Sequence, residues 1–241
     1  MVATLGPEPK DGALTKETKW LFEQAVRCLD SIQNAPVPFW TLGGGTALAM
    51  YFNHRESKDI DIFLSDAQYI PYLSPRLNDV VADVTEAYDE MSNYLKLRFP
   101  GLGEIDFIVA PLLTSPGYIE REICGVTTRI ETPIEIVVKK VFYRASELTQ
   151  RDAIDIALVL EKMPSVAFST PLLWAKREAL AVRLRFLASH FDRFAIALKP
   201  GYEHLAKESV QILESWLKRT DTFPADLGPG PRGNLGPVDR R

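Results

Sequence analysis

The sequence predicts an α/β protein of the α+β type, in which a mixed sheet flanked by helices is followed by a helical C-terminal domain. Three patterns support this class: a helical repeat of apolar residues near the N-terminus, short β-rich runs through residues 39–130, and helical periodicity from about residue 133 onward. The 241 residues are 46% hydrophobic and 25% charged, which is typical of a globular chain and excludes collagen-like, coiled-coil and largely disordered proteins.

The N-terminal segment has a clear order of expected elements. Residues 1–14 carry no periodic pattern, so we expect a flexible arm. From Thr15 apolar residues recur at three- and four-residue spacing, which predicts a helix that ends before residues 34–38. A short strand at residues 39–42 then leads into three glycines, and a short helix is expected from Thr46 to about Tyr51.

Five further segments are rich in β-branched and aromatic residues and are bounded by polar or turn residues, which predicts strands. They are residues 60–64, 80–88, 94–99, 104–110 and 126–130. Pro100-Gly101 begins a tight turn that ends at Gly103, so the two strands on either side of it are expected to form a hairpin.

The rest of the chain reads as helices separated by proline. The expected helices are residues 133–145, 149–163, 172–190 and 202–217, and from residue 222 a tail rich in Pro and Gly is expected to be disordered. The predicted organisation is therefore a flexible arm (1–14), a sheet-containing core (15–132), a helical domain (133–221) and a disordered tail (222–241).

Charge and cysteine content exclude several classes. With 28 basic and 32 acidic residues the net charge is −4, so no global positive field attracts nucleic acid. Cys28 and Cys124 cannot form a disulfide framework, and with three histidines they fit no common zinc spacing. No apolar run is long enough to span a membrane, and the first 14 residues lack the apolar core of a signal peptide. We expect a cytoplasmic protein without a membrane partner.

The most informative pattern is Gly44-Gly45-Thr46 followed by Asp59-Ile60-Asp61. Carboxylates at i and i+2 on a strand point to the same face, and two such acids repel unless a cation lies between them. Magnesium is the usual cation for oxygen ligands near phosphates, and the glycines offer backbone N–H groups to a phosphate. The pattern therefore indicates a metal-assisted phosphate site.

A two-metal site needs a third acid. Asp106 is the best candidate, because it lies on a predicted strand between apolar residues, and Glu104 has the same facing and is the alternative. Two magnesium ions held in this way would neutralise charge that develops during phosphoryl transfer.

These residues resemble the DNA polymerase β-like nucleotidyltransferase superfamily, in which a Gly-Gly-Thr turn, an Asp-x-Asp strand and a later lone Asp occur in this order. Residues 44–49 and 54–63, together with a lysine-bearing helix at 136–144 and Arg151-Asp152-Ala153-Ile154-Asp155, are similar to the AbiEii/AbiGii family of nucleotidyltransferase toxins from type IV toxin–antitoxin and abortive-infection systems. The resemblance implies a nucleotidyltransferase fold, with a cognate antitoxin as partner.

The resemblance also implies roles for individual residues. Gly44, Gly45 and Thr46 would hold the phosphates of an NTP, and Asp59, Asp61 and Asp106 would bind magnesium. Lys140 would contact the triphosphate, with Asp152 and Asp155 beside it. The candidate catalytic residues are thus Asp59, Asp61, Asp106, Lys140, Asp152 and Asp155, and the candidate substrate-binding residues are Gly44, Gly45, Thr46, Arg55, Ser57 and Arg144.

Structural explanations compete with several of these roles. Thr149 and Asp152 have the spacing of a variant helix capping box, which would explain Asp152 without catalysis. Arg55 and Ser57 either bind substrate or order the loop before Asp59, and Arg144 could pair with Glu147 or Asp155. Lys139 is an adjacent alternative to Lys140 but faces differently.

The activity expected from this resemblance is magnesium-dependent transfer of a nucleoside monophosphate from an NTP to an acceptor, with RNA, especially a tRNA 3′ end, or a protein hydroxyl as the acceptor. Residues 171–220 carry a charge of about +4, so a basic helical face could hold RNA, although a mixed solvated surface explains the same charges. The alternatives are a metal-dependent glycosyltransferase that uses the Asp-x-Asp motif and a catalytically silent nucleotide-binding protein.

Overall fold

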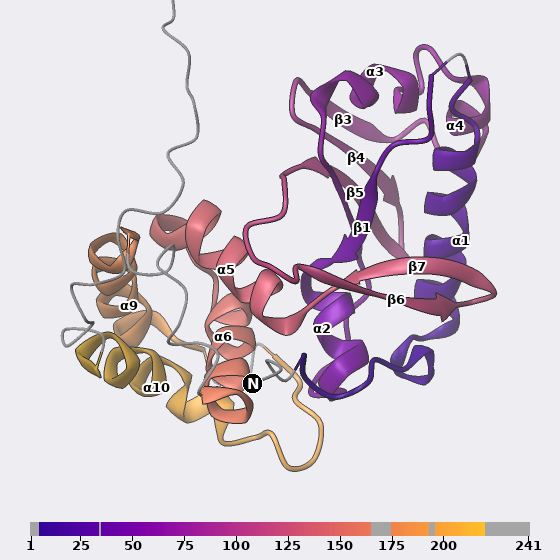
Figure 1. The fold of residues 1–241 in the computed structure, drawn as a ribbon. Coiled ribbons are helices and arrows are strands. Elements are labelled where there is room, and N and C mark those ends of the chain that lie inside the picture. Colours follow the sequence, from indigo (N-terminus) through magenta and orange to yellow (C-terminus); the bar gives the residue numbers. More distant parts are fainter. Residues whose placement is uncertain (1–4, 34, 165–174, 193–195, 220–241) are drawn as a thin grey trace, which may run out of the picture.

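The computed structural model describes residues 5–33, 35–164, 175–192 and 196–219 of the chain. Figure 1 shows a sheet with its helices on one side of the molecule and a group of helices from the C-terminal part on the other. The expected tail (222–241) and the start of the expected helix 172–190 lie outside the described residues.

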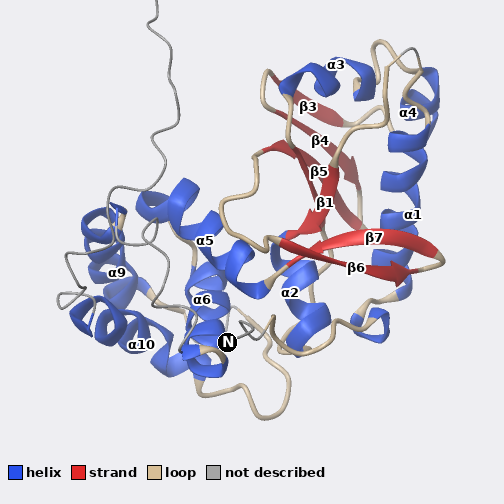
Figure 2. Ribbon diagram, in the orientation of Figure 1, coloured by secondary structure: helices blue, strands red, loops and turns tan. Residues whose placement is uncertain are grey.

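The sheet has seven strands in the order β3-β4-β5-β2-β1-β7-β6 (Figure 2). The strands are β1 (Trp40–Gly43), β2 (Ile60–Leu64), β3 (Tyr88–Met91), β4 (Tyr94–Phe99), β5 (Gly103–Val109), β6 (Tyr118–Ile123) and β7 (Val126–Glu131). The pairs β2–β5 and β1–β7 are parallel and the other pairs are antiparallel, so the sheet is mixed, as predicted.

The main helices are α1 (Lys16–Asp30), α2 (Gly44–Phe52), α5 (Pro133–Arg144), α6 (Gln150–Lys162), α9 (Arg177–His190) and α10 (Leu205–Arg219), with the short α3 (Ile70–Leu73) and α4 (Asp79–Val84) at one end of the sheet. Thr15 caps α1 by accepting a hydrogen bond from the Thr18 amide. Helix α1 packs on β5 and β2, whereas α10 packs on α6 and α9. Among the described residues, no helix is both long and apolar enough to cross a membrane.

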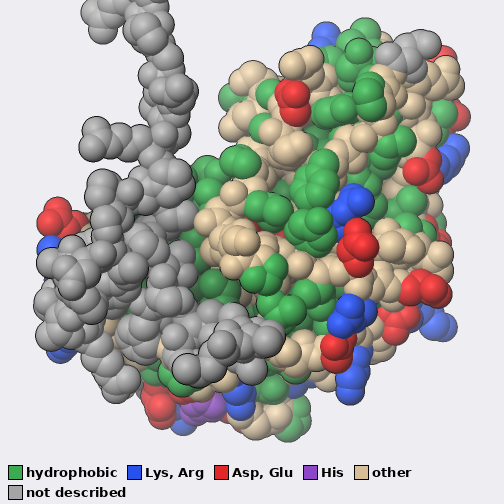
Figure 3. All heavy atoms as spheres, in the orientation of Figure 1, with side chains coloured by type: hydrophobic (Ala, Val, Ile, Leu, Met, Phe, Trp, Pro, Cys, Tyr) green, Lys and Arg blue, Asp and Glu red, His purple; other side chains and the backbone are tan. Residues whose placement is uncertain are grey.

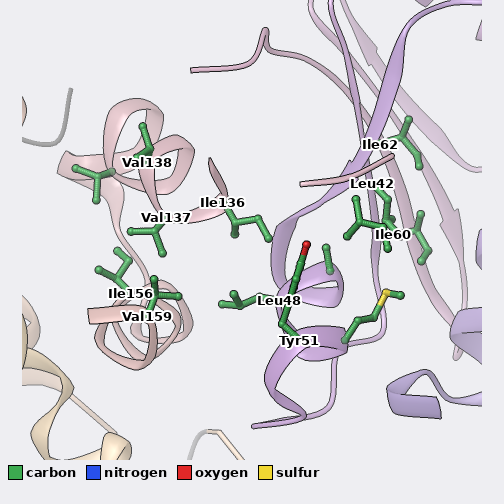
Figure 4. Close-up of a cluster of buried hydrophobic side chains, with 14 of the residues drawn as sticks. Leu42, Leu48, Tyr51, Ile60, Ile62, Ile136, Val137, Val138, Ile156 and Val159 are labelled. Atoms are coloured by element: carbon green, nitrogen blue, oxygen red, sulfur yellow. The ribbon is translucent and has the colours of Figure 1, made fainter. Parts of the chain in front are cut away.

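One hydrophobic cluster joins the sheet to the helices that follow it. Figure 4 shows side chains of β1, β2 and α2 facing those of α5 and α6, among them Leu42, Leu48, Ile136 and Val159. All four are 1% exposed or less, so α5 and α6 pack closely against the side chains of the sheet and α2. This shared core positions the polar side chains of α5 and α6 relative to those of β2.

Most expected elements are present, including the 94–99/104–110 hairpin, but residues 80–88 do not form the predicted strand. The side chain of Asn78 accepts hydrogen bonds from the amides of Val80 and Val81 and starts α4, and the strand begins only at Tyr88. A capped helix start overrode the β propensity of the valines here. Strand β6 was not predicted, because Glu120, Arg121 and Glu122 give its centre no apolar alternation.

The described part of the N-terminal segment lies against the core. The Lys10 amide donates to the Met50 carbonyl (2.9 Å), Glu8 pairs with Arg121 of β6 (2.7 Å), and Leu14 is buried. These contacts attach residues 8–14 to α2 and to the edge of the sheet.

Candidate active site

Alternation along three neighbouring strands builds one polar face of the sheet. On β2, Ile60, Ile62 and Leu64 point into the core, so Asp61 and Phe63 point to the opposite face. The same alternation applies to β5 and β4. The strand register aligns the side chains of this face in three rows. The first row holds Arg98 and Glu104. The second holds Lys96, Asp106 and Asp61, and the third holds Tyr94, Ile108 and Phe63.

The middle row brings together two carboxylates. Asp61 and Asp106 are partners across the parallel β2–β5 pair. Burial and then the charge of Asp106 raise the pKa of Asp61 to about 7, although Lys140 acts in the opposite direction. Burial also raises the pKa of Asp106, against the effect of Lys96, whose ammonium lies 2.9 Å from its carboxylate. The Oδ1 atom of Asp106 is buried and lies 2.9 Å from the same ammonium in an ion pair, without the alignment of a hydrogen bond.

Asp59 and Glu104 lie one row before this pair. The Glu104 amide donates to Asp59 Oδ1 (3.2 Å), which directs the Asp59 carboxylate along the same face. The Glu104 carboxylate is ion-paired with Lys96 and with Arg98. Of the two candidates for a third acid, Asp106 is the direct neighbour of Asp61 and the less exposed, at 19% against 36%.

The glycines begin α2 directly beside these acids. Gly44 has φ +66°, and a Cβ atom there would collide with the Asp61 carboxylate. A Cβ atom on Gly45 would collide with the Arg55 guanidinium. The backbone at the N-terminus of α2 therefore approaches the acids more closely than any side chain would allow, in a position that suits an anion.

The Thr46 side chain bonds to the backbone, whereas the sequence predicts that it holds the phosphates. Its side chain is fully buried and its hydroxyl donates to the carbonyl oxygen of Asp59. It fixes the loop that carries Asp59 to the start of α2, so the side chain itself does not face the open site.

Lys140 on α5 reaches the same region from the helical side. Its ammonium lies 2.5 Å from Asp152 Oδ1 and 3.2 Å from Asp155 Oδ2. Burial lowers the pKa of Lys140, but the charges of Asp155 and Asp152 outweigh it and the net pKa is raised. The lysine is therefore held charged at a defined place.

Asp155 is the centre of a buried network. It is fully buried and accepts two hydrogen bonds from Arg55 (2.9 and 2.8 Å). The Nε2 atom of His54 lies 2.8 Å from its Oδ1 atom. Burial alone would raise the pKa of Asp155, but the charges of Lys140 and Arg55 and these hydrogen bonds hold it well below its usual value. Arg55 thus orders the loop before Asp59 through a bidentate ion pair.

Asp152 has two functions in the structure. It forms the capping box with Thr149 at the start of α6, and its other oxygen bonds to Lys140. Arg144 lies 3.7 Å from the same carboxylate, rather than pairing with Glu147 or Asp155. The capping box that the spacing predicts is therefore present, and the same residue also lines the polar cavity.

Two cavities meet at the acids. The first, here called the polar cavity, has a volume of about 540 Å³. Of the predicted site residues it is lined by Gly45, Arg55, Ser57, Asp59, Asp61, Asp106, Lys140, Arg144 and Asp152. Gly44 lines only the second cavity, of about 680 Å³, while Thr46 and Asp155 line neither.

Several residues near the site were missed. Lys96 lines both cavities and bonds to Asp106, and the alternation Tyr94-x-Lys96-x-Arg98 opposite the Asp106 strand was the available signal. Arg151 lines the polar cavity and precedes Asp152 in the motif. Lys139 does face differently from Lys140: it bonds to Glu131 (2.5 Å) and the Ala110 carbonyl (3.3 Å) and lies over the Phe63 ring.

The chemistry of the acids suits a divalent cation, although their side chains do not converge on one point as metal ligands do. In the described part of the chain, no group of three or more His, Cys, Asp or Glu side chains is arranged to hold a metal ion. The donor set nevertheless suits magnesium, because it consists of hard carboxylate oxygens on neighbouring acids, and the negative charge of Asp106 is one cause of the raised pKa of Asp61.

An acid pair on a mixed sheet, beside a glycine-rich helix start and a charged lysine, defines a class of phosphoryl-transfer site. The model of the family described as nucleotidyl transferase AbiEii toxin, type IV TA system, matches residues 27–227, which is more than half of the chain. The chain belongs to this nucleotidyltransferase family. The resemblance seen in the sequence is confirmed, and the family membership decides against a glycosyltransferase.

The other comparisons are more distant. No curated protein matches the chain. An antigenic nucleotidyltransferase-like protein from Paracoccidioides brasiliensis is 16% identical, with 80% of this chain and 94% of that chain covered and a TM-score of 0.39. CdnG of Bradyrhizobium diazoefficiens, solved in complex with GTP, is 9% identical over 90% of this chain and 88% of that chain, with a TM-score of 0.33. At these scores the family match alone carries the assignment.

Proposed function

We propose that this nucleotidyltransferase toxin transfers a nucleoside monophosphate from an NTP to an RNA acceptor, with a tRNA 3′ end as the expected target, in a magnesium-dependent reaction. The observation that carries the proposal is the alignment of Asp61 with Asp106 beside the N-terminus of α2. It supports a site where a triphosphate and a divalent cation bind together.

The three acids would hold the cation. Asp59, Asp61 and Asp106 lie on one face of the sheet and line one cavity. Magnesium bound there would neutralise the charge of the phosphates and of the attacking oxygen. In the transfer, an acceptor hydroxyl oxygen forms a bond to the α-phosphorus, the bond from that phosphorus to the β-phosphate oxygen breaks, and pyrophosphate leaves.

The chain's own cations would hold the triphosphate. Lys140 is fixed by Asp152 and Asp155 at the wall of the polar cavity, and Arg144 and Arg151 lie beside it. The backbone amides of Gly44 and Gly45 would complete the phosphate site. His54, Arg55 and Asp155 are positioning residues. They bond to one another and fix the loop before Asp59 and the Lys140 ammonium, so the charge of Arg55 is already paired with Asp155.

An open groove of about 630 Å³ adjoins the polar cavity and offers room for an acceptor. It shares Arg55, Ser57, Asp59, Glu104 and Arg151 with that cavity and continues past Lys58 and Arg98. Elsewhere, on the face that Figure 3 draws, basic and acidic side chains are interspersed rather than gathered into a patch. We therefore place the acceptor's phosphates in the groove, where Lys58, Arg98 and Arg151 lie beside the acids.

The family also implies an antitoxin. A type IV toxin belongs to a toxin–antitoxin system, so a cognate antitoxin is the expected partner. A small protein encoded beside this gene is the first candidate.

The test is transfer of label from each of the four NTPs to total RNA and to protein, with and without magnesium. We expect the wild-type chain to label RNA only with the metal and Asp61→Ala to lose orders of magnitude in rate. Asp83→Ala is the matched control, because Asp83 is an exposed acid on α4 remote from the cavities.

Equal labelling by the wild type and Asp61→Ala would contradict the site. Labelling of protein instead of RNA would contradict the acceptor. NTP binding without transfer to any acceptor would support the catalytically silent alternative.

A further inference from the structure

The second cavity, here called the aromatic cavity, begins at the residues of the phosphate chemistry described above and extends beyond them. It has a volume of about 680 Å³ and shares six residues with the polar cavity, namely Gly45, Asp61, Lys96, Asp106, Lys140 and Arg144. Beyond these shared residues the two differ in chemistry: the polar cavity continues past Asp59 and Glu104, whereas the aromatic cavity continues past Phe63, Ile108 and Tyr94.

The register of the sheet explains this difference. Phe63, Ile108 and Tyr94 are the next row after Asp61, Asp106 and Lys96 on the same face. Because alternate residues of a strand are about 6.6 Å apart, an apolar row lies roughly one sugar's length from the acids. A group attached to a phosphate at Asp61 and Asp106 would reach this row.

Side chains of α5 close the cavity from the other side. Tyr143 and Ile136 line it, and Tyr143 is 49% exposed, so an aromatic face is available there to a ligand. The Phe63 ring is held by the Lys139 ammonium, 4.1 Å from its centroid. Tyr94 of β4 and Tyr143 of α5 therefore both line the cavity, and its Phe63 wall is fixed by the buried Lys139–Glu131 ion pair.

A polar group lies within this lining as well. Glu131 lines the aromatic cavity, is fully buried, and its Oε2 atom accepts no hydrogen bond. Its Oε1 atom is already used by Thr41 and Lys139. Because Glu131 is fully buried, it forms part of the rear of the wall and does not offer an open acceptor to a ligand.

We propose that the aromatic cavity is a nucleobase subsite in which Tyr94 and Tyr143 contact the face of the base. The inference rests on the proposed function, since the phosphate bound at the acids fixes the base here. Flat rings stack on aromatic side chains, and the cavity is large enough for one nucleoside. The base belongs either to the NTP or to the terminal nucleoside of the acceptor, and the two sources give different kinetics.

The experiment uses Tyr94→Leu and Tyr143→Leu in the full chain, with Tyr72→Leu as control. Tyr72 is also partly exposed but lies on α3, away from both cavities. Leucine keeps apolar bulk and removes the aromatic face, and thermal unfolding checks that each variant folds. The first readout is the binding of the four nucleoside monophosphates against ribose 5-phosphate, which needs no transfer.

We expect the wild type to bind at least one nucleoside monophosphate more tightly than ribose 5-phosphate, and each cavity variant to lose roughly 5- to 100-fold of that preference. In the transfer assay a raised KM for the NTP assigns the base to the donor, and a raised KM for the acceptor assigns it to the acceptor. An unchanged preference in both cavity variants, equal to that of Tyr72→Leu, would overturn the subsite. If the wild type showed this binding preference but transferred no label to any acceptor, the proposed function would be overturned and the subsite would not.

Discussion

Asp61 of β2 and Asp106 of β5 are direct neighbours across two parallel strands, and both carboxylates face the cavity side of the sheet. Lys96 lies 2.9 Å from Asp106, yet the pKa of both acids is raised, in each case chiefly by burial and for Asp61 also by the charge of Asp106. The protein therefore carries a local electrostatic cost at this position that a bound cation would remove.

Replacing Asp61 by asparagine tests that cost. Without divalent metal at pH 8 we expect Asp61→Asn to unfold at a temperature a few degrees higher than the wild type, since a repulsive buried charge worth about 1 kcal/mol is removed. Magnesium should raise the melting temperature of the wild type and leave that of the variant nearly unchanged. An equal magnesium response in both proteins, or a less stable variant, would contradict the cation site.

The Gly44 backbone gives a second prediction. Gly44→Ala should abolish most transfer activity and lower stability by about 1–3 kcal/mol, because φ is +66° and the new Cβ would meet the Asp61 carboxylate. Gly12→Ala is the matched control, since nothing lies within 4 Å of a Cβ there and its φ is not positive. Chemical denaturation and the transfer assay measure the two effects. Full activity in Gly44→Ala would show that the close approach of α2 is dispensable.

The buried network predicts how stability depends on pH. The pKa of Asp155 is far below that of an unfolded aspartate, so its ion pairs stabilise the protein above about pH 4 and this stability is lost as the pH falls. Asp155→Asn should lose roughly 3–5 kcal/mol at pH 7, because Arg55 and Lys140 keep their charges with fewer partners. Below pH 4 the wild type should lose stability more steeply than the variant.

Urea denaturation of both proteins between pH 3 and pH 7 measures this difference. Asp83→Asn, a change at an exposed acid of α4, serves as the control and should follow the wild type. Parallel stability curves for the wild type and Asp155→Asn would show that the network contributes nothing that depends on this carboxylate.

The sequence was sufficient for the parts of the site that depend on spacing. Alternation placed Asp59 and Asp61 on one face, and helical spacing placed Lys140 and Asp152 on neighbouring helices. It could not place Lys96, since only the pairing of β4 with β5 brings that lysine opposite Asp106. Nor could it show that Asp155 is buried beneath Lys140 and Arg55, because that depends on how α6 packs against the loop before β2. Tertiary pairing, not local pattern, decides such contacts.

Adjacent lysines of α5 should separate stability from activity. Lys139 is 4% exposed and bonds to the fully buried Glu131, whereas Lys140 lines the polar cavity. Lys139→Met leaves the Glu131 carboxylate buried without its main partner, so we expect a loss of about 3–5 kcal/mol. Lys140→Met also loses stability through its ion pairs with Asp152 and Asp155, but it should in addition raise the KM for the NTP and lower the transfer rate.

A double variant distinguishes the two effects. Combining Lys139→Met with Glu131→Gln removes both charges of the pair while the Glu131 position can still accept from Thr41, so most of the lost stability should return. The double variant leaves the acids and Lys140 in place, so its transfer rate should fall less than that of Lys140→Met, although both changes lie in the wall of the aromatic cavity. Denaturation curves and kinetics on the three variants measure this. If Lys139→Met lost transfer at unchanged stability, or if the double variant stayed as unstable as Lys139→Met, the assignment of a structural role to Lys139 and a phosphate-binding role to Lys140 would be wrong.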